Sequence, residues 1–193
     1  MPSAFPPALP KGSFSTSDQP RITVDDALLR PWIPGDAAGL VEAFDDPAIR
    51  QWHVNRADTV DEARELITRW QGGWADESEF NWAIVGVDDT LLGRIALKGV
   101  DLFDATAEVA YWMCPASRGR GLCPRAVVTL SEWAFDAGFH RLQLQHSTRN
   151  LPSCRVATKA GFREEGTRRG AALHADGWHD MHGHARLSQD DGC

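Results

Sequence analysis

The sequence predicts a mixed α/β fold in one domain, with a central mixed sheet of about seven strands and about four flanking helices. Three observations predict it. Short β-rich runs alternate with runs of helical period. Their order is a meander of strands followed by a helix, a strand, a helix and two strands. The 193 residues, 42% of them hydrophobic, are enough for one sizeable core.

Composition argues against two classes of partner. The formal net charge is −7, whereas a sequence-independent nucleic-acid binder needs a basic face that neutralises phosphates. The sequence lacks a run of about 20 apolar residues, so we expect no membrane partner. An acidic surface suits cationic acceptors such as amines.

The cysteines are scattered, with no C-x-x-C pair and no metal-ligand spacing among them. Free thiols of this kind are typical of a reducing compartment, so we expect a cytoplasmic protein. They are Cys114, Cys123, Cys154 and Cys193.

Residues 1–20 carry five prolines together with serine and glycine. They lack the basic start and the apolar block of a signal peptide. This composition predicts an irregular, mobile tail. We expect the ordered domain over residues 21–187 and a short C-terminal tail over residues 188–193.

Two short strands, residues 22–24 and 27–30, open the expected domain and pair across a two-residue turn. A helix follows with Asp36 as its N-cap. A second helix starts at Thr59, where Glu62 completes a capping-box pattern, and ends near Gly72-Gly73.

Strands and helices alternate in the rest of the chain. The long helix after residue 121 carries an apolar stripe and stops at Gly138, as a C′ glycine should. The expected strands are residues 81–87, 91–100, 106–113, 141–146, 162–169 and 179–187, and a short helix covers residues 152–160.

Residues 107–126 read as a strand that runs into a Gly/Arg turn and then opens this long helix. Such a turn aims several backbone N–H groups and the positive helix end at one point, which attracts phosphate. A P-loop is excluded, because Gly119 and Gly121 are one residue apart and no Lys-Ser/Thr follows. A dinucleotide fingerprint is excluded as well, because its third glycine is missing.

The turn, read as Arg-Gly-Arg-Gly-Leu-Cys over residues 118–123, resembles the pyrophosphate loop of the GNAT acetyltransferase superfamily. Its Tyr-Trp-Met-Cys-Pro lead-in is most similar to the RimJ/RimL-like branch. The resemblance covers about residues 21–187 and implies a sheet with a splayed middle, and acetyl-CoA (coenzyme A) as co-substrate. Cys123 stands where glycine or alanine is usual; a thiol is only slightly larger than a methyl group, so we expect the loop to survive.

The resemblance also implies roles for these residues. Backbone N–H groups of the loop would hold the pyrophosphate, and the side chains of Arg118 and Arg120 would add charge-assisted contacts. The N–H of Met113 would donate to the acyl oxygen. The cofactor-binding residues implied in this way are Tyr111, Trp112, Met113, Arg118, Gly119, Arg120, Gly121, Leu122, Cys123, Asn150 and Ser153.

A second motif, residues 150–162, resembles the superfamily's Asn-x-x-Ser/Ala segment, in which the Asn150 amide would bind pantetheine. Many members place a tyrosine seven residues after this asparagine to protonate the leaving thiolate; here that residue is Ala157, and the only tyrosine is Tyr111. RimJ/RimL-like enzymes present a serine three residues after the asparagine, which is Ser153. Its role is either this catalytic acid or a local bond to the helix backbone.

Glu108 is the candidate catalytic base. Period-2 alternation places it on one strand face with Ala110 and Trp112, near the expected cleft, where it would take a proton from the amine. The alternative is a strand-edge glutamate that holds a backbone amide or an arginine. In the superfamily the first two helices border the acceptor groove. Trp52, Trp70 and Trp74 therefore have two alternative roles: they form an aromatic wall for a cationic amine, or they pack against the sheet.

Four histidines, His174, His179, His182 and His184, gather near the C-terminal end, and His182 and His184 share a strand face with Asp180. We expect no metal there, because strand spacing alone fixes no tetrahedron and the superfamily uses none. Lining of the acceptor mouth is the expected role.

We therefore expect an acetyl-CoA-dependent N-acetyltransferase that acts directly, without a covalent enzyme intermediate, because Cys154 lacks a matched His/Asp set in the sequence. The acceptor would be a primary amine of a small molecule or of a peptide or protein N-terminus. A coenzyme A-binding sensor without turnover is the alternative. The resemblance also suggests a homodimer.

Overall fold

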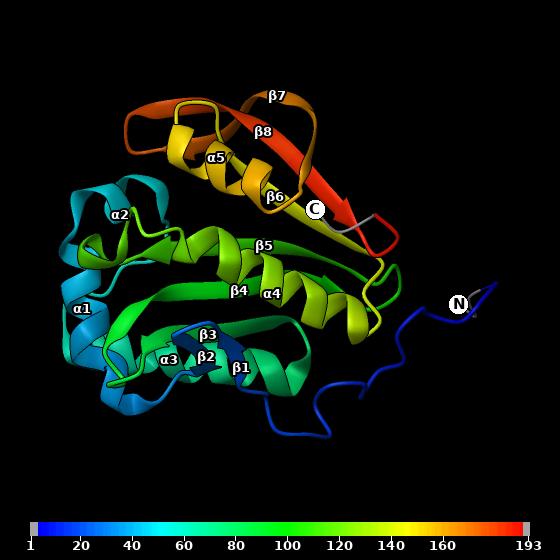
Figure 1. The fold of residues 1–193 in the computed structure, drawn as a ribbon, viewed down its shortest axis with the longest axis horizontal. Helices are drawn as coiled ribbons and strands as arrows, with labels where there is room; N and C mark the ends of the chain where they lie inside the picture. The colour runs from blue at the N-terminus through cyan, green and yellow to red at the C-terminus, as the bar shows by residue number, and fades with distance from the viewer. Residues whose placement is uncertain (1–3, 191–193) are drawn as a thin grey trace.

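The computed structural model describes residues 4–190 and places its strands in one mixed sheet, in the order β1-β2-β3-β4-β5-β6-β8-β7 (Figure 1). The predicted fold class is confirmed. The described residues contain a strand at each of the eight predicted ranges, against the overall figure of about seven, and five α-helices, one more than expected. The strands are β1 (Ile22–Val24), β2 (Ala27–Pro31), β3 (Glu79–Gly86), β4 (Leu91–Asp101), β5 (Thr106–Met113), β6 (Arg141–Ser147), β7 (Arg163–His174) and β8 (Gly177–Leu187). The helices are α1 (Ala37–Asp45), α2 (Pro47–Trp52), α3 (Val60–Asp76), α4 (Leu122–Asp136) and α5 (Leu151–Lys159). Within the described residues, none of these helices has the length and apolar character needed to cross a membrane.

The sheet is splayed between β5 and β6, which confirms the expected open middle. All other neighbouring strands pair antiparallel, whereas β5 and β6 pair parallel over only three positions, Thr106 to Glu108 against Arg141 to Gln143. Beyond Glu108 the two strands diverge, and Figure 1 shows β6 and β8 leaving β4 and β5 at an angle. A wedge-shaped opening is therefore built into the sheet.

Helices cover both faces of the sheet. In Figure 1, α4 lies in front of the sheet and α3 lies behind it. On one face α4 packs against β1, β5 and α5, and on the other α3 packs against β3 and α1. Two hydrophobic cores lie on the two faces, and side chains of β3 alternate between them. Trp82 and Ile84 belong to the larger core, whereas Ala83 and Val85 belong to the smaller one with α1 and α3.

The N-terminal segment differs from the mobile tail that the sequence predicted. Residues 4–20 form no helix or strand, yet the side chains of Leu9 and Phe14 are buried in the larger core. The carboxylate of Glu77 accepts hydrogen bonds from the N–H groups of Gly12 and Phe14, each at 2.7 Å, and of Ser15 at 3.1 Å. The proline-rich composition predicted an irregular backbone, but it did not indicate that Leu9 and Phe14 are buried in the core. Residues 188–190 of the expected C-terminal tail form a turn, and the rest of it lies outside the described residues.

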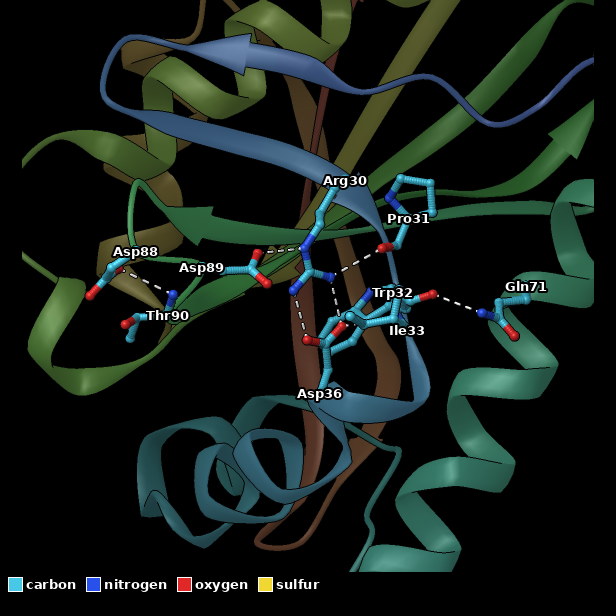
Figure 2. A network of polar contacts seen from close by, with 9 residues as sticks. All are labelled: Arg30, Pro31, Trp32, Ile33, Asp36, Gln71, Asp88, Asp89 and Thr90. Atoms are coloured by element: carbon cyan, nitrogen blue, oxygen red, sulfur yellow. Dashed lines mark hydrogen bonds and ion pairs between the residues drawn. The ribbon is translucent and has the colours of Figure 1, made fainter.

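Asp36 is not a side-chain cap, contrary to the expectation. It precedes α1 at the end of a short 3₁₀ turn and makes no side-chain cap bond to the helix. Its carboxylate instead pairs with the guanidinium of buried Arg30, both contacts being 2.8 Å, and Arg30 also contacts Asp89 at 2.8 Å. Figure 2 shows Arg30 reaching from β2 to both carboxylates. This network ties β2 to the start of α1 and to the β3–β4 turn.

Two helices differ from the predicted pattern. The capping box at Thr59 is present, but α3 runs through the two glycines to Asp76 and ends at Glu77. Gly73 is retained inside the helix because a Cβ there would lie 2.5 Å from the carbonyl oxygen of Glu79. The short helix α2 was not predicted; it is capped by Asp46, whose carboxylate accepts from the N–H of Ile49 at 3.0 Å. It stands beside the opening of the sheet.

Candidate active site

A cleft of about 500 Å³ lies where β5 and β6 diverge. Its walls come from α2, from the end of β5, from the turn before α4 and from α5. Ten of the predicted site residues line it: Tyr111, Trp112, Met113, Arg118, Gly119, Gly121, Leu122, Cys123, Asn150 and Ser153. Arg120 and Glu108 do not. Two cations on α5 that the sequence analysis did not single out, Arg155 and Lys159, also line it.

The end of β5 turns two free backbone donors toward the cleft. The N–H of Cys114 donates to the carbonyl oxygen of Leu92 at 2.8 Å, on the β4 side. Because N–H groups alternate sides along an antiparallel strand, those of Tyr111 and Met113 point to the opposite edge. β6 pairs with β5 only as far as Glu108, so these two amides face the opening.

The turn before α4 is built on two left-handed glycines. Gly119 has φ +78° and Gly121 has φ +73°, a backbone conformation that favours glycine. Gly121 is the N-cap of α4, so the N–H groups of Leu122 and Cys123 lie in the first turn, where no intrahelical carbonyl reaches them. The guanidinium of Arg125 donates to the carbonyl oxygen of Arg120 at 3.1 Å. The turn thus presents free amides at a positive helix end.

The side chain of Arg118 is engaged within the protein. Its Nε donates to the carbonyl oxygen of Met113 at 3.0 Å, and its Nη2 lies 2.6 Å from Asp46. The guanidinium of Arg118 lowers the pKa of Asp46. Arg118 therefore holds the end of β5 to the start of α2. The phosphate contact that the resemblance implied stays a prediction.

Ser153 and Asn150 occupy separate positions at the start of α5. The Asn150 carboxamide oxygen caps the helix by accepting from the N–H of Ser153 at 3.2 Å. The Ser153 hydroxyl lies 2.8 Å from the phenol oxygen of Tyr111 on β5. Burial raises the pKa of Tyr111, so its phenol stays protonated. The sequence did not pair these residues, because 42 positions separate them.

Two thiols near the cleft are poor nucleophiles. Burial raises the pKa of Cys123 to about 12 and that of Cys114 to about 11. The thiolate is the reactive form of cysteine, and it is scarce at neutral pH for both residues.

Glu108 lies outside the cleft lining, at the closed end of the opening. It stands on β5 opposite Gln143 of β6, where the two strands still pair. Its carboxylate lies 3.0 Å from Nζ of Lys98 and 3.5 Å from Nε2 of Gln145. Its partners are thus a lysine and a glutamine, whereas the alternative reading expected a backbone amide or an arginine; the role of Glu108 as the base stays a prediction.

His53, which follows α2, is a titratable cleft residue that the sequence analysis missed. Its Nδ1 lies 3.0 Å from the carbonyl oxygen of Asn55; a carbonyl only accepts, so Nδ1 carries the hydrogen and Nε2 has a free lone pair. Burial lowers the pKa of His53 to about 4, helped by the nearby charge of Arg94. The ring is therefore neutral at physiological pH.

Only one of the three candidate wall tryptophans lines the cleft, namely Trp52. Trp70 is buried against Trp32, and the guanidinium of Arg94 lies 4.7 Å from its ring centroid. Trp74 is buried in the core and donates to the carbonyl oxygen of Ser17 at 2.8 Å. Packing against the sheet is therefore the role of both.

The four C-terminal histidines separate into two groups, and none lines the cleft. The rings of His174 and His179 lie beside Trp52, with centroid distances of 5.5 and 6.0 Å. His182 and His184 instead face α5, where they meet His146 and Cys154. Alternation along β8 predicted the shared face of His182 and His184, but not their neighbours from other elements.

Known proteins resemble this chain in sequence. A family model described as an acetyltransferase (GNAT) domain matches residues 26–163. The chain is 33% identical over 147 residues to the Probable N-acetyltransferase YjcK of Bacillus subtilis (strain 168). The aligned residues cover 73% of this chain and 81% of that protein. It is 28% identical over 101 residues to the ribosomal-protein-serine acetyltransferase of Escherichia coli (strain K12), covering 52% of this chain and 56% of that one.

Solved structures share the fold. RimL, a ribosomal L7/L12 alpha-N-protein acetyltransferase in complex with coenzyme A, superposes with a TM-score of 0.78 at 18% identity. The match covers 87% of this chain and 98% of that one. At this identity the likeness establishes the fold alone.

Proposed function

Because this chain belongs to the acetyltransferase (GNAT) family and is an acetyl-CoA-dependent N-acetyltransferase, we propose that it transfers acetyl directly to a primary amine inside the cleft. One observation carries the proposal: free amides of β5 and the glycine turn before α4 face the same cleft. The co-substrate supplies an activated thioester when bound. The residues of the chain bind it, stabilise charge and move protons.

The turn over residues 118–123 is the proposed pyrophosphate cradle. Its amides and the positive end of α4 converge, and anions bind such helix starts well. Because Arg118 is occupied by Asp46 and Met113, the cationic side chains assigned here are Arg155 and Lys159 on α5. The Asn150 carboxamide uses its oxygen as a cap, which leaves its NH₂ group as the donor for the pantetheine arm.

The N–H groups of Met113 and Tyr111 are the proposed donors to the acyl oxygen and the adjoining arm. They lie on the open edge of β5, where no strand competes for them. Donors fixed in advance at the place where negative charge develops are worth about 3 kcal/mol each in acyl transfer.

Ser153 is the proposed acid for the leaving thiolate, and Tyr111 its positioning residue. The phenol of Tyr111 stays protonated, and both Ser153 Oγ at 2.8 Å and the Ser153 carbonyl oxygen at 3.3 Å can accept its hydrogen. When the phenol donates to Oγ, the serine hydrogen is free for the sulfur. The serine gives its proton to the departing sulfur and regains one from solvent through the open cleft.

Two groups are proposed to receive the proton of the amine. His53 lines the cleft with a free Nε2 and is neutral. Glu108, the residue predicted from the sequence, stands at the closed end of the opening and needs a water relay. Substitution of His53 and of Glu108 by glutamine distinguishes these two candidate bases.

The proposed acceptor is the α-amino group of a peptide or protein N-terminus, with small primary amines as the other class that the cleft would take. The name of the Escherichia coli relative, a ribosomal-protein-serine acetyltransferase, supports the first class. Trp52, the last residue of α2, lines the cleft and offers an aromatic face for a cationic amine.

Thiol release from acetyl-CoA over a panel of N-terminal peptides, aminoglycosides, polyamines and amino acids tests the proposal. We expect turnover with at least one peptide, and acetylated product that matches the released thiol in amount. Saturable coenzyme binding without turnover on the whole panel would contradict the proposal and favour a sensor.

A further inference from the structure

A second polar cluster lies between α5 and the sheet, away from the cleft. It contains His146 of β6, Cys154 of α5, and His182 and His184 of β8. One ligating atom from each residue can be chosen so that all four lie within 4.8 Å of one another. His146 and His184 are buried, and the other two are half-buried. None of the four lines the cleft.

The spacing within the cluster is close to that of a tetrahedral metal site. The Nε2 atoms of His146 and His184 lie 3.1 Å apart. Two nitrogens that each lie about 2.0–2.1 Å from one tetrahedral zinc ion are about 3.3 Å apart. The remaining separations, up to 4.8 Å, need only a small inward movement of side chains.

Hydrogen bonding already orients one ligand. The Nδ1 of His146 lies 2.8 Å from the carbonyl oxygen of Ser147, which can only accept. Nδ1 therefore carries the hydrogen, and the Nε2 lone pair faces the cluster, where it accepts a hydrogen bond from Nε2–H of His184. A ring held through its second nitrogen by a backbone carbonyl is the usual arrangement of a metal-bound histidine.

Among the residues that the structure describes, the cluster also contains a nitrogen without a hydrogen-bond partner and a thiol that forms no disulfide. The Nδ1 of His182 is buried and has no hydrogen-bond partner among the described residues. The thiol of Cys154 is free of any disulfide. Buried polar atoms without partners are uncommon, and a site for an ion is one of the explanations for them.

We propose that His146, Cys154, His182 and His184 bind one zinc ion. Three imidazoles and one thiolate suit zinc, whereas magnesium and calcium prefer oxygen ligands. Binding removes the thiol proton of Cys154, which passes to solvent, and the resulting thiolate forms the bond to the metal. The expectation of no metal considered the cysteines and the C-terminal histidines separately. The cluster combines two of those histidines with Cys154 of α5 and His146 of β6.

The site would fasten α5 to two strands of the sheet. Cys154 directly follows Ser153, whose hydroxyl faces Tyr111, so a bound ion would also fix the end of α5 that borders the cleft. Because a metal that binds only the folded state stabilises it, zinc should raise the melting temperature.

The test uses full-length, untagged protein that has been treated with a chelator and then titrated with zinc in a calorimeter. We expect one zinc ion per chain and a higher melting temperature. Cobalt in place of zinc should give the visible bands of a tetrahedral site and a thiolate-to-cobalt charge-transfer band. Fewer than one ion per chain, or cobalt bound without thiolate, would overturn the proposal.

Two variants locate the site. Cys154→Ser should remove the charge-transfer band, and His184→Asn should weaken zinc binding by at least roughly 100-fold. The matched controls are Cys114→Ser and His140→Asn, which lie outside the cluster and should keep both signals. Circular dichroism confirms that each variant is folded. Loss of the band in Cys114→Ser but not in Cys154→Ser would overturn the assignment. These readouts use no acetyl-CoA, so their outcome is independent of the proposed acetyl transfer.

Discussion

The hydroxyl oxygen of Ser153 lies 2.8 Å from the phenol oxygen of Tyr111, and this contact joins the two sides of the splayed sheet. Tyr111 belongs to β5, whereas Ser153 belongs to α5, which packs on β6 and β7. Both residues line the cleft. In the proposed mechanism, this contact lies where the thioester sulfur passes between the β5 amides and the start of α5.

Replacement of Ser153 by alanine should lower kcat by about 100-fold with little change in coenzyme A binding, because only the proton donor to the sulfur is lost. Tyr111→Phe should lower kcat less, because it removes only the orienting contact. Steady-state kinetics and calorimetric titration of coenzyme A measure the two effects. Thr158→Ala removes an exposed hydroxyl from the same helix and serves as the control. Unchanged turnover in Ser153→Ala would remove this serine from the mechanism.

Gly121→Trp should abolish coenzyme A binding, because a large side chain at a left-handed position fills the space that the phosphates need. Gly99 is a matched control: its φ is +57°, its surroundings are open and it lies outside the cleft. We expect Gly99→Trp to carry a similar backbone strain and to keep coenzyme A binding in the same calorimetric titration. Equal affinity in both variants would place the phosphates elsewhere.

Arg118→Ala should weaken coenzyme A binding indirectly, because the end of β5 loses its bond to the guanidinium. Asp46→Asn removes the partner of Arg118 and should reproduce part of the loss, together with about 1 kcal/mol of unfolding free energy. Urea titration and calorimetry check both variants. If Arg118→Ala weakens binding and Asp46→Asn has no effect, the arginine contacts the ligand directly.

Glu77→Gln should lower the free energy of unfolding by about 2 kcal/mol at pH 7, because a carboxylate that accepts three backbone N–H groups is lost. Burial raises the pKa of Glu77, but the bonds from Gly12, Phe14 and Ser15 outweigh it, so the pKa is lowered in the folded state. A lowered pKa stabilises the fold above the unfolded-state value and loses that effect as the pH falls through the folded-state value.

Urea titrations from pH 7 to pH 3 test this sign. The difference between wild type and Glu77→Gln should shrink toward acid pH. Glu65→Gln, an exposed change on the same helix, should show no such trend. A difference that stays constant or grows with acid would contradict the anchoring role of the Glu77 carboxylate.

His53→Gln should lower kcat/KM for the amine by at least roughly tenfold, and by more than Glu108→Gln does, because His53 is the group with a free acceptor nitrogen in the cleft. The pKa of His53 is about 4, so the wild type should show no loss from this group between pH 8 and about pH 5. Rates measured against pH with a weakly basic amine check this. A larger loss of kcat/KM in Glu108→Gln than in His53→Gln would instead support Glu108 as the base, as the sequence predicted.

Local signals predicted most of the fold. The strand at Thr106–Met113 was predicted with its observed bounds, and the capping box at Thr59 marks the start of α3. These features depend on neighbouring residues alone. The end of α3 was missed because the reason for Gly73 is its contact with Glu79 on the next strand. The N-terminal segment was missed because Leu9 and Phe14 are held by distant residues.

The same division applies to the site. The glycine turn and the free amides of β5 follow from a contiguous motif, and the structure places them in one cleft. The contact of Tyr111 with Ser153 depends on how far β6 turns from β5, and the proximity of His146 to Cys154 depends on how α5 packs on β6. No local pattern encodes either arrangement. Arg118 lines the cleft, as its motif indicated, but the motif did not indicate its ion pair with Asp46 at the start of α2.

The most direct test of direct transfer is a single turnover with acetyl-labelled acetyl-CoA and an accepted peptide, sampled by intact-mass spectrometry. We predict that the label passes to the peptide amine, that free thiol appears at the same rate, and that the protein mass never changes. A labelled protein that forms before the product, or thiol release without a labelled amine, would contradict the account.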